Sequence, residues 1–248
     1  MYAFRNASYR SLVSSPPEEL SLLDQKDSDI IRQTATLPDR LQSMGEEIAN
    51  SISHGVGFLA ALAAMPLLLI HVARRKDVGV LVGVSIFAAT VLFLYLTSTL
   101  YHALPRGKAK HVFRITEHIA IFLLIAGTYT PFTLGVLRGP WGWTLFGLVW
   151  ALSAAGVVLK LVGGVRFPVI STLLYLSMGW VVLIAMRPLW LRIPHAGFLW
   201  MLLGGLAYTT GVIFYALDRR LRYSHFIWHL FVLAGTTLHF FAIFWYAA

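Results

Sequence analysis

Seven long hydrophobic runs constrain this chain more than any other feature of its sequence. Each is about 20 residues long, the length that an α-helix needs to cross the hydrocarbon core of a bilayer. The runs cover residues 51–73, 78–104, 112–137, 141–161, 168–186, 197–217 and 225–246. Of the 248 residues, 58% are hydrophobic and only 12% are charged. The sequence therefore predicts an all-α membrane protein, a bundle of seven transmembrane helices.

The first 45 residues differ from the rest of the chain. They mix acidic, basic, Ser and Pro residues without sustained periodicity, so we interpret residues 1–45 as a polar cytoplasmic tail without stable structure. The pattern of residues 37–52 fits a short amphipathic helix leading into the membrane. We expect one seven-helix transmembrane domain over residues 46–248.

Basic residues gather on one side of the predicted bundle. Fourteen of the 20 Lys and Arg residues lie in the N-terminal region or in the loops on its side. Because cytoplasmic loops are rich in Lys and Arg, the count predicts a cytoplasmic N-terminus and a C-terminus outside. The net charge of +9 suits contact with anionic lipid headgroups rather than with nucleic acid. We expect a multi-pass protein of the plasma membrane.

Polar side chains within the hydrophobic runs fall at one predicted depth. Ser98 and His102 share a face near the end of the second run, and Glu117 lies near the start of the third. His225 and His229 open the seventh run, four residues apart and so on the same side of a helix. All lie within one or two turns of loops on the N-terminal side, roughly 5–10 Å along a helix. A buried imidazole is costly without a partner, so we expect these side chains to face one another.

This combination of side chains indicates a metal site. Three imidazoles with an open position are typical of catalytic zinc, whereas structural zinc sites use four protein ligands, usually including Cys. The chain has no Cys. The pattern therefore predicts Zn²⁺ bound by His102, His225 and His229, with other divalent metals as alternatives. Glu117 would bind or orient the metal's water, and Ser98 would contact the substrate or support a ligand.

Each of these residues also has an ordinary interpretation. A pair of histidines in a membrane helix is often packed, hydrogen-bonded or part of a proton relay. Glu117 could extend its carboxylate to the interface, and Ser98 could bond to its own helix. The convergence of His102 and Glu117 with His225 and His229 at one depth is what favours the metal site.

Three further histidines are weaker candidates. His118 follows Glu117 but points about 100° away on a helix. His54 opens the first run and is interpreted either as a group on the substrate side or as a histidine at headgroup level. His71 falls toward the opposite face of the membrane.

The polar motifs resemble those of the hemolysin III family, which belongs with the progestin and adiponectin receptors and, more distantly, the alkaline ceramidases. The matching stretches are residues 46–55, 98–102, 117–118, 126–132 and 224–229. They occur in order on the expected helices, and the resemblance covers about residues 45–246. It implies seven helices, a cytoplasmic N-terminus and an intramembrane zinc with ligands at His102, His225 and His229.

The same resemblance implies roles for Glu117 as the acidic residue of the site and for Ser98 as its serine. The chain departs from the family pattern at the acidic position, where the family usually has Asp. The extra methylene of Glu117 moves the carboxylate by about one C–C bond length. That shift would either bring the carboxylate onto the metal or alter a contact made through water.

Two functions from different classes follow from these observations. The first is a zinc-dependent hydrolase, similar to ceramidases, that acts on an amide or ester of an acyl lipid. The second is a membrane regulator or receptor without enzymatic activity, in which zinc is structural. A pore-forming, hemolysin-like protein has less support, because the runs lack the spaced carboxylates and broken helices of ion-coupled transport. A cavity at the metal open to lipid would favour the hydrolase, and a closed coordination sphere would favour the regulator.

Overall fold

The computed structural model describes residues 41–247, and all regular structure in that range is helical. The elements are α3 (Met44–Ala73), α4 (Val78–Ala103), α5 (Lys108–Leu134), α6 (Pro140–Gly163), α7 (Pro168–Trp180), the 3₁₀ helix η1 (Val181–Ala185), α8 (Met186–Arg192), α9 (His195–Ala216) and α10 (Ser224–Tyr246). They form 7 helical spans long and apolar enough to cross a membrane, with α7, η1 and α8 together making the fifth. The predicted seven-span, all-α architecture is confirmed. The tail predicted over residues 1–45 lies almost wholly outside the described residues.

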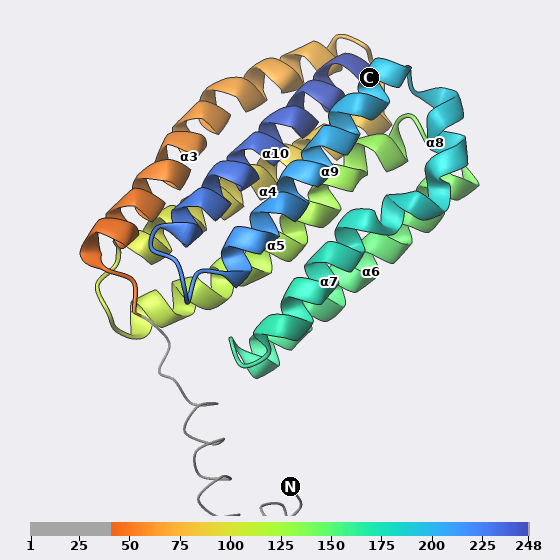
Figure 1. Cartoon of the computed structure of the whole chain (residues 1–248). Helices are drawn as coiled ribbons and strands as arrows, with labels where there is room; N and C mark the ends of the chain where they lie inside the picture. The colour runs from red at the N-terminus through yellow and green to blue at the C-terminus, as the bar shows by residue number, and fades with distance from the viewer. Residues whose placement is uncertain (1–40, 248) are drawn as a thin grey trace, which may run out of the picture. The chain divides into compact units, whose positions relative to one another are not determined.

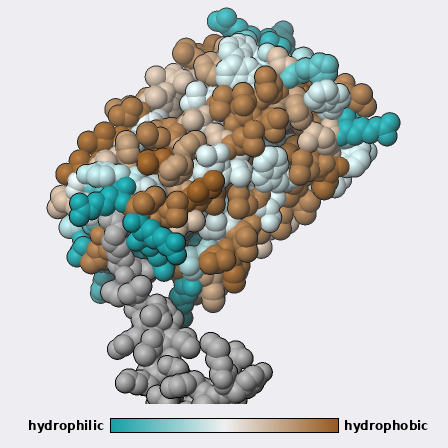
Figure 2. Space-filling model, viewed as in Figure 1, coloured by the Kyte–Doolittle hydropathy of each residue, from teal (hydrophilic) through white to brown (hydrophobic). Residues whose placement is uncertain are grey.

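The first four spans pack side by side in order, and the last packs between the sixth and the first (Figure 1). Helix α10 lies between α3 and α9 and contacts both of them. Helix α5 contacts α4, α6 and α7, whereas α7 and α9 make few contacts with each other. Hydrophobic residues cover most of the face shown in Figure 2, and hydrophilic residues gather toward the ends of the bundle. This distribution is the one expected for a protein whose middle is surrounded by lipid.

Two glycines allow close packing of neighbouring helices. A Cβ atom on Gly83 of α4 would lie 2.7 Å from the Cα atom of Pro131 in α5. One on Gly204 of α9 would lie 2.5 Å from Cε1 of His239 in α10. Both glycines are therefore required for the observed approach of neighbouring helices, as is common in membrane bundles.

Helix α3 begins earlier than the hydrophobic run that predicts it. Ser43 is the N-cap, and its backbone N–H and hydroxyl both donate to Oε2 of Glu46 at 2.9 Å. This capping box starts the helix at Met44, although the apolar run begins near residue 51. The other oxygen of Glu46 accepts a hydrogen bond from the backbone N–H of Tyr223 at 2.9 Å, next to the start of α10. From Met44 onward, the segment predicted as a separate amphipathic helix is instead the first part of the first span.

The fifth span is longer than predicted and contains a break. The sequence suggests that this helix ends near residue 186, because Pro188 and two arginines follow, but α8 continues to Arg192. Pro188 is tolerated because it lies in the first turn of α8, where its missing N–H would have no helical partner. The break itself is the 3₁₀ helix η1, where the hydroxyl of Tyr129 accepts a hydrogen bond from Val182 N at 3.0 Å. The same hydroxyl donates to the carbonyl of Gly179 at 2.7 Å, so one side chain of α5 satisfies backbone groups freed by the break.

An ion pair joins two connections at the end of the bundle where α3 ends and α4 begins. Asp77 is the N-cap of α4, and both of its carboxylate oxygens accept hydrogen bonds from Nη2 of Arg138 at 2.6 Å. The hydrogen bond from Arg138 lowers the pKa of the Asp77 carboxyl group, and the N–H of Val80 at the start of α4 adds to this effect.

Seven spans place the N-terminal end of α3 and the C-terminal end of α10 at opposite ends of the bundle, and the loop charges predict which end is cytoplasmic. Because the chain lacks Cys, single cysteines can be introduced without a background signal. We expect Ala248→Cys to react with an impermeant maleimide on intact cells, and Gly107→Cys, in the exposed connection between α4 and α5, to react only after lysis. The reverse labelling pattern would contradict the predicted orientation.

Candidate metal centre

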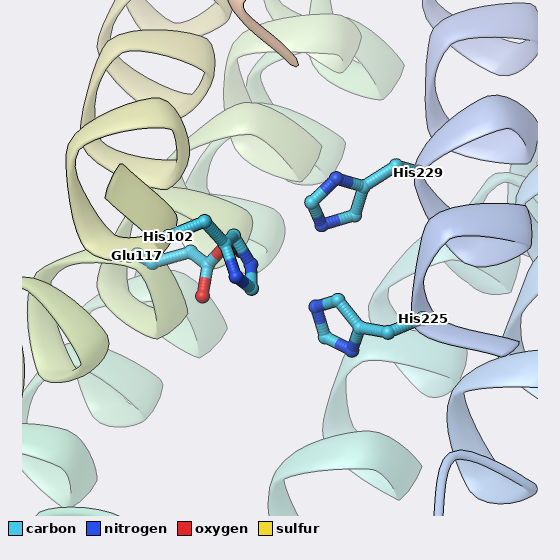
Figure 3. Close-up of side chains that lie close together, drawn as sticks. All are labelled: His102, Glu117, His225 and His229. Carbon is cyan, nitrogen blue, oxygen red and sulfur yellow. Dashed lines mark ion pairs between the residues drawn. The ribbon is translucent and has the colours of Figure 1, made fainter. Parts of the chain in front are cut away.

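Four side chains from three helices meet near the end of the bundle where α3 begins. Helix α4 supplies His102, α5 supplies Glu117, and α10 supplies His225 and His229. One ligand atom from each residue lies within 4.8 Å of those of the others. In Figure 3, His102 and Glu117 point into a shared space from one side, and His225 and His229 point into it from the other. His102, Glu117 and His229 are buried, and the side chain of His225 is 12% exposed. The structure thus brings together the residues predicted as metal ligands and as the site's carboxylate.

The Nδ1 atom of His102 is held by the first helix. It donates a hydrogen bond to Oε2 of Glu47 in α3 at 2.8 Å. The other oxygen of Glu47 forms a 3.0 Å ion pair with Lys110 of α5. Lys110 also donates to the carbonyl of Tyr101 at 2.9 Å, next to His102. This network fixes the orientation of the imidazole and leaves Nε2 as the nitrogen that faces the cluster.

The Nδ1 atoms of the two histidines of α10 also face oxygen atoms. Nδ1 of His229 donates to the hydroxyl of Ser53 at 2.9 Å and to the carbonyl of Asn50 at 3.2 Å. Nδ1 of His225 lies 3.4 Å from Oδ2 of Asp218, in the connection between α9 and α10. Nδ1 of His102 and of His229 is thus hydrogen-bonded to oxygen in the way usual for metal-binding imidazoles, whereas Nδ1 of His225 lies near a carboxylate without forming a hydrogen bond among the described residues.

The Nε2 atoms of these three histidines are buried and have no hydrogen-bond partner among the described residues. Leaving a buried polar atom unpaired costs about 1–3 kcal/mol, so three in one place indicate a missing partner. Nε2 of His102 lies 3.7 Å from Oε1 of Glu117, close to the separation of about 3.4 Å between two ligands of a tetrahedral zinc ion. Imidazole and carboxylate donors without thiolate suit zinc and other divalent metals. The residues present therefore fit a metal ion.

Ser98 has the environment expected of a functional hydroxyl. It is fully buried one turn before His102, and its Oγ has no hydrogen-bond partner within residues 41–247. Its neighbours behave differently, because Thr97 and Thr99 donate to carbonyls of their own helix at 2.8 and 2.6 Å. The ordinary interpretation of Ser98, a hydroxyl bonded to its own helix, is therefore wrong.

The structure separates two of the three weaker histidine candidates, His118 and His54. His118 is outside the cluster, with Nδ1 donating to the carbonyl of Arg114 at 2.6 Å and Nε2 lying 3.5 Å from the hydroxyl of Tyr215. His54 is buried beside the cluster, and its ring stacks on that of His229 with centroids 3.7 Å apart and planes 3° apart. Neither ring nitrogen of His54 has a hydrogen-bond partner in the described part of the chain.

Two neighbouring spaces lie on this side of the bundle, and the smaller one adjoins the cluster. The smaller, which we call the chamber, measures about 20 Å³ and is lined by His54, Glu117, His118 and His225 together with apolar side chains. The larger, which we call the apolar cavity, measures about 160 Å³, is partly open, and is lined mainly by α5, α7, α9 and α10. Both spaces are lined by Leu94, Ile121, Tyr215, Trp228 and Val232. The cluster therefore faces an apolar space between loosely contacting helices.

The sequence analysis did not identify the residues that contact the Nδ1 sides of the candidate histidine ligands. The main ones are Glu47, Asn50 and Asp218. A signal for the first two exists. Glu47, Asn50 and His54 are spaced three and then four residues apart, so they share one face of α3. Asp218 lies in a connection rather than a helix, and only the folded chain brings it close to His225.

The fold and the cluster define a multi-pass integral membrane protein whose buried histidines and carboxylate could hold a metal ion. The chain belongs to the haemolysin III family, because the model of the Haemolysin-III related family matches residues 42–240. This match covers every residue of the cluster.

Individual relatives agree with this assignment. Hemolysin-3 of Bacillus cereus is 42% identical over 205 residues, covering 83% of this chain and 93% of that protein. The Hemolysin-3 homolog of Bacillus subtilis (strain 168) is 44% identical over 201 residues, covering 81% and 94%. The Monocyte to macrophage differentiation factor of Homo sapiens is 27% identical over 213 residues, covering 81% and 84%. The similarity thus spans most of the chain and of each relative.

Protein purified in mild detergent should contain about one zinc per chain, as expected for a single site with an open position. His102→Ala and His225→Ala should lower metal content and thermal stability together, because a metal bound only by the folded state stabilises it. Elemental analysis and thermal unfolding measure both effects, with His71→Ala on the far part of α3 as the control. Normal metal content in both site variants would overturn the ligand assignment.

Glu47→Gln should weaken metal binding without removing a ligand. The glutamine can still accept from His102, but it lacks the charge that strengthens the imidazole as a ligand and pairs with Lys110. We expect affinity to fall by about 10–100-fold, the usual effect of changing such a partner. Competition with a chelator measures it, and Asp77→Asn, which removes a carboxylate at the opposite end of the bundle, serves as the control. Equal affinities in the two variants would mean that Glu47 does not support the site.

Proposed function

We propose that this protein is a metal-dependent hydrolase that cleaves an amide or ester bond of a long-chain acyl lipid within the membrane. One observation carries the proposal: the chamber, which is lined by Glu117 and His225 of the cluster, shares five lining residues with an apolar cavity of about 160 Å³. A purely structural metal needs no such space. We further propose zinc as the metal, the plasma membrane as the location, and membrane lipids as both surroundings and substrate.

The proposed chemistry assigns distinct tasks to the metal and to the chain. Zinc, when bound, lowers the pKa of a coordinated water to about 7 and polarises a carbonyl group. His102, His225 and His229 would hold the ion through Nε2, and the oxygen atoms near Nδ1 would keep the rings in place. The apolar walls of the cavity take up the acyl chain, so that the scissile bond lies at the end of the cavity nearest the cluster.

Glu117 is the candidate for proton transfer. It is the carboxylate that shares the space of the cluster with the three imidazoles, and it also lines the chamber. From this position it can accept a proton from the attacking water and return it to the leaving group. Ser98 can donate its hydroxyl proton to the substrate carbonyl oxygen, because that hydroxyl has no hydrogen-bond partner among residues 41–247.

The competing account is a membrane regulator or receptor in which a metal joins α4, α5 and α10 and Glu117 is a fourth ligand. It predicts the same metal content but no turnover. A lytic pore, which the names of the Bacillus relatives suggest, has less support because the larger space beside the cluster is lined mainly by apolar side chains. Ions crossing a membrane require polar groups or water along their path.

Glu117→Gln separates these accounts. The amide keeps the shape of the side chain but cannot accept the proton, so hydrolysis should fall by about 10²–10⁴-fold while zinc is retained. The assay compares wild type and variant on a panel of long-chain ceramides, acyl amides and acyl esters, with zinc measured on the same samples. Loss of zinc would make Glu117 a ligand rather than a base. Zinc-loaded wild type without turnover on any of the panel would favour the regulator.

A further inference from the structure

His54 is a buried imidazole at the metal centre for which the proposed chemistry has no role. His54 is 2% exposed, and both of its ring nitrogens lack a hydrogen-bond partner within the described residues. Nearly all buried polar groups in proteins are hydrogen-bonded, to protein or to something held by it. The ring of His54 therefore indicates a partner outside residues 41–247.

The geometry of its stacking shows that this partner is not the ion of the cluster. The rings of His54 and His229 are parallel within 3° and have centroids 3.7 Å apart. A metal ion lies in the plane of each imidazole that binds it, about 2.0–2.1 Å from the nitrogen. An ion in the plane of His229 would lie well out of the plane of His54, so the two rings cannot bind the same ion.

The chamber is where a partner for His54 can lie. Its volume of about 20 Å³ is enough for roughly one water molecule, which needs at least about 10–15 Å³ measured in this way. His54 lines it together with Glu117 and His225. The chamber therefore accommodates one small polar group between His54 and the cluster.

The chamber is also where a chain lying in the apolar cavity would end. The two spaces share five lining residues, three of them being Ile121, Trp228 and Val232. A long acyl chain in the apolar cavity would thus direct its polar end into the chamber. At the first carbon of an acyl amide or ester, the atom that fits a space of this size is the carbonyl oxygen.

We infer that His54 binds the substrate by donating a hydrogen bond from its imidazole N–H to the carbonyl oxygen of the acyl lipid. The inference rests on the proposed function and names the group that sets the depth of the substrate in the cavity. A neutral imidazole has one N–H donor, and a carbonyl oxygen is only an acceptor, so the two are complementary. A site with a buried donor also selects against ligands that lack the acceptor, because the donor then stays unpaired.

Two ligands that differ only in the carbonyl group test this inference. Zinc-loaded protein in nanodiscs is titrated with 2-nonadecanone, which has a carbonyl but no bond to hydrolyse, and with nonadecane. His54→Phe keeps an aromatic ring to stack on His229 but removes the donor. It should weaken binding of the ketone by about tenfold, the value of one buried hydrogen bond, and leave binding of the alkane and the zinc content unchanged.

Infrared spectroscopy of the bound ketone reports the hydrogen bond directly. A hydrogen bond lowers the stretching frequency of a carbonyl group, so His54→Phe should raise that frequency, and His54→Gln, which restores a donor, should lower it again. His71→Phe is the matched control, because His71 lies on the same helix and stacks on an aromatic ring, that of Phe244 at 4.3 Å. If the Phe variant does not fold, His54→Gln and His54→Leu provide the same comparison.

The outcomes separate the inference from the function on which it rests. One outcome is that wild type prefers the ketone to the alkane, while His54→Phe leaves the affinity for the ketone and its carbonyl stretching frequency unchanged. This result would overturn the role of His54 but not the proposed function. Wild type that binds ketone and alkane equally would overturn both this role and the proposal of an acyl-lipid substrate.

Discussion

The candidate metal centre depends on three imidazole nitrogens that are buried near one end of a membrane bundle and have no hydrogen-bond partner among the described residues. Other groups of the fold must therefore hold the rings so that these nitrogens face one space. The N-terminal part of α3 does this for two of the three, since Glu47 holds His102 and Ser53 with Asn50 holds His229. The first helix thus supplies no candidate ligand to the cluster but positions the ligands of α4 and α10.

The third histidine is connected to the same region less directly. Nδ1 of His225 faces Asp218, and Gln42, which lies just before α3, donates to the Asp218 carboxylate at 3.1 Å. Gln42 also accepts a hydrogen bond from the side chain of Asn50 at 2.9 Å. Gln42, next to the capping box of α3, therefore contacts both Asp218 beside His225 and Asn50 beside His229. A change there would alter the cluster without touching a ligand.

Much of this architecture follows from the sequence, because lipid imposes simple rules. Runs of about 20 apolar residues must be helices, and two histidines four apart on one helix must share a face. What could not be predicted depends on contacts between distant segments. The 3₁₀ break at η1 depends on the hydroxyl of Tyr129, and the early start of α3 depends on a cap at Ser43. The chamber exists only because Leu94, Ile121 and Val232 come together from three helices.

The geometry of Glu117 is where the hydrolase and the regulator differ physically. Its Oε1 lies 3.7 Å from Nε2 of His102, so the carboxylate is close enough to share an ion with the imidazoles. A carboxylate bound directly would complete a tetrahedral shell and leave no position for water or substrate. Glu117 also lines the chamber, and a carboxylate that faces this space instead of the ion would leave one ligand position open. The apolar cavity that shares five lining residues with the chamber would be of use only in the open arrangement. For this reason the shape of the protein around Glu117, rather than the set of ligands, favours the hydrolase.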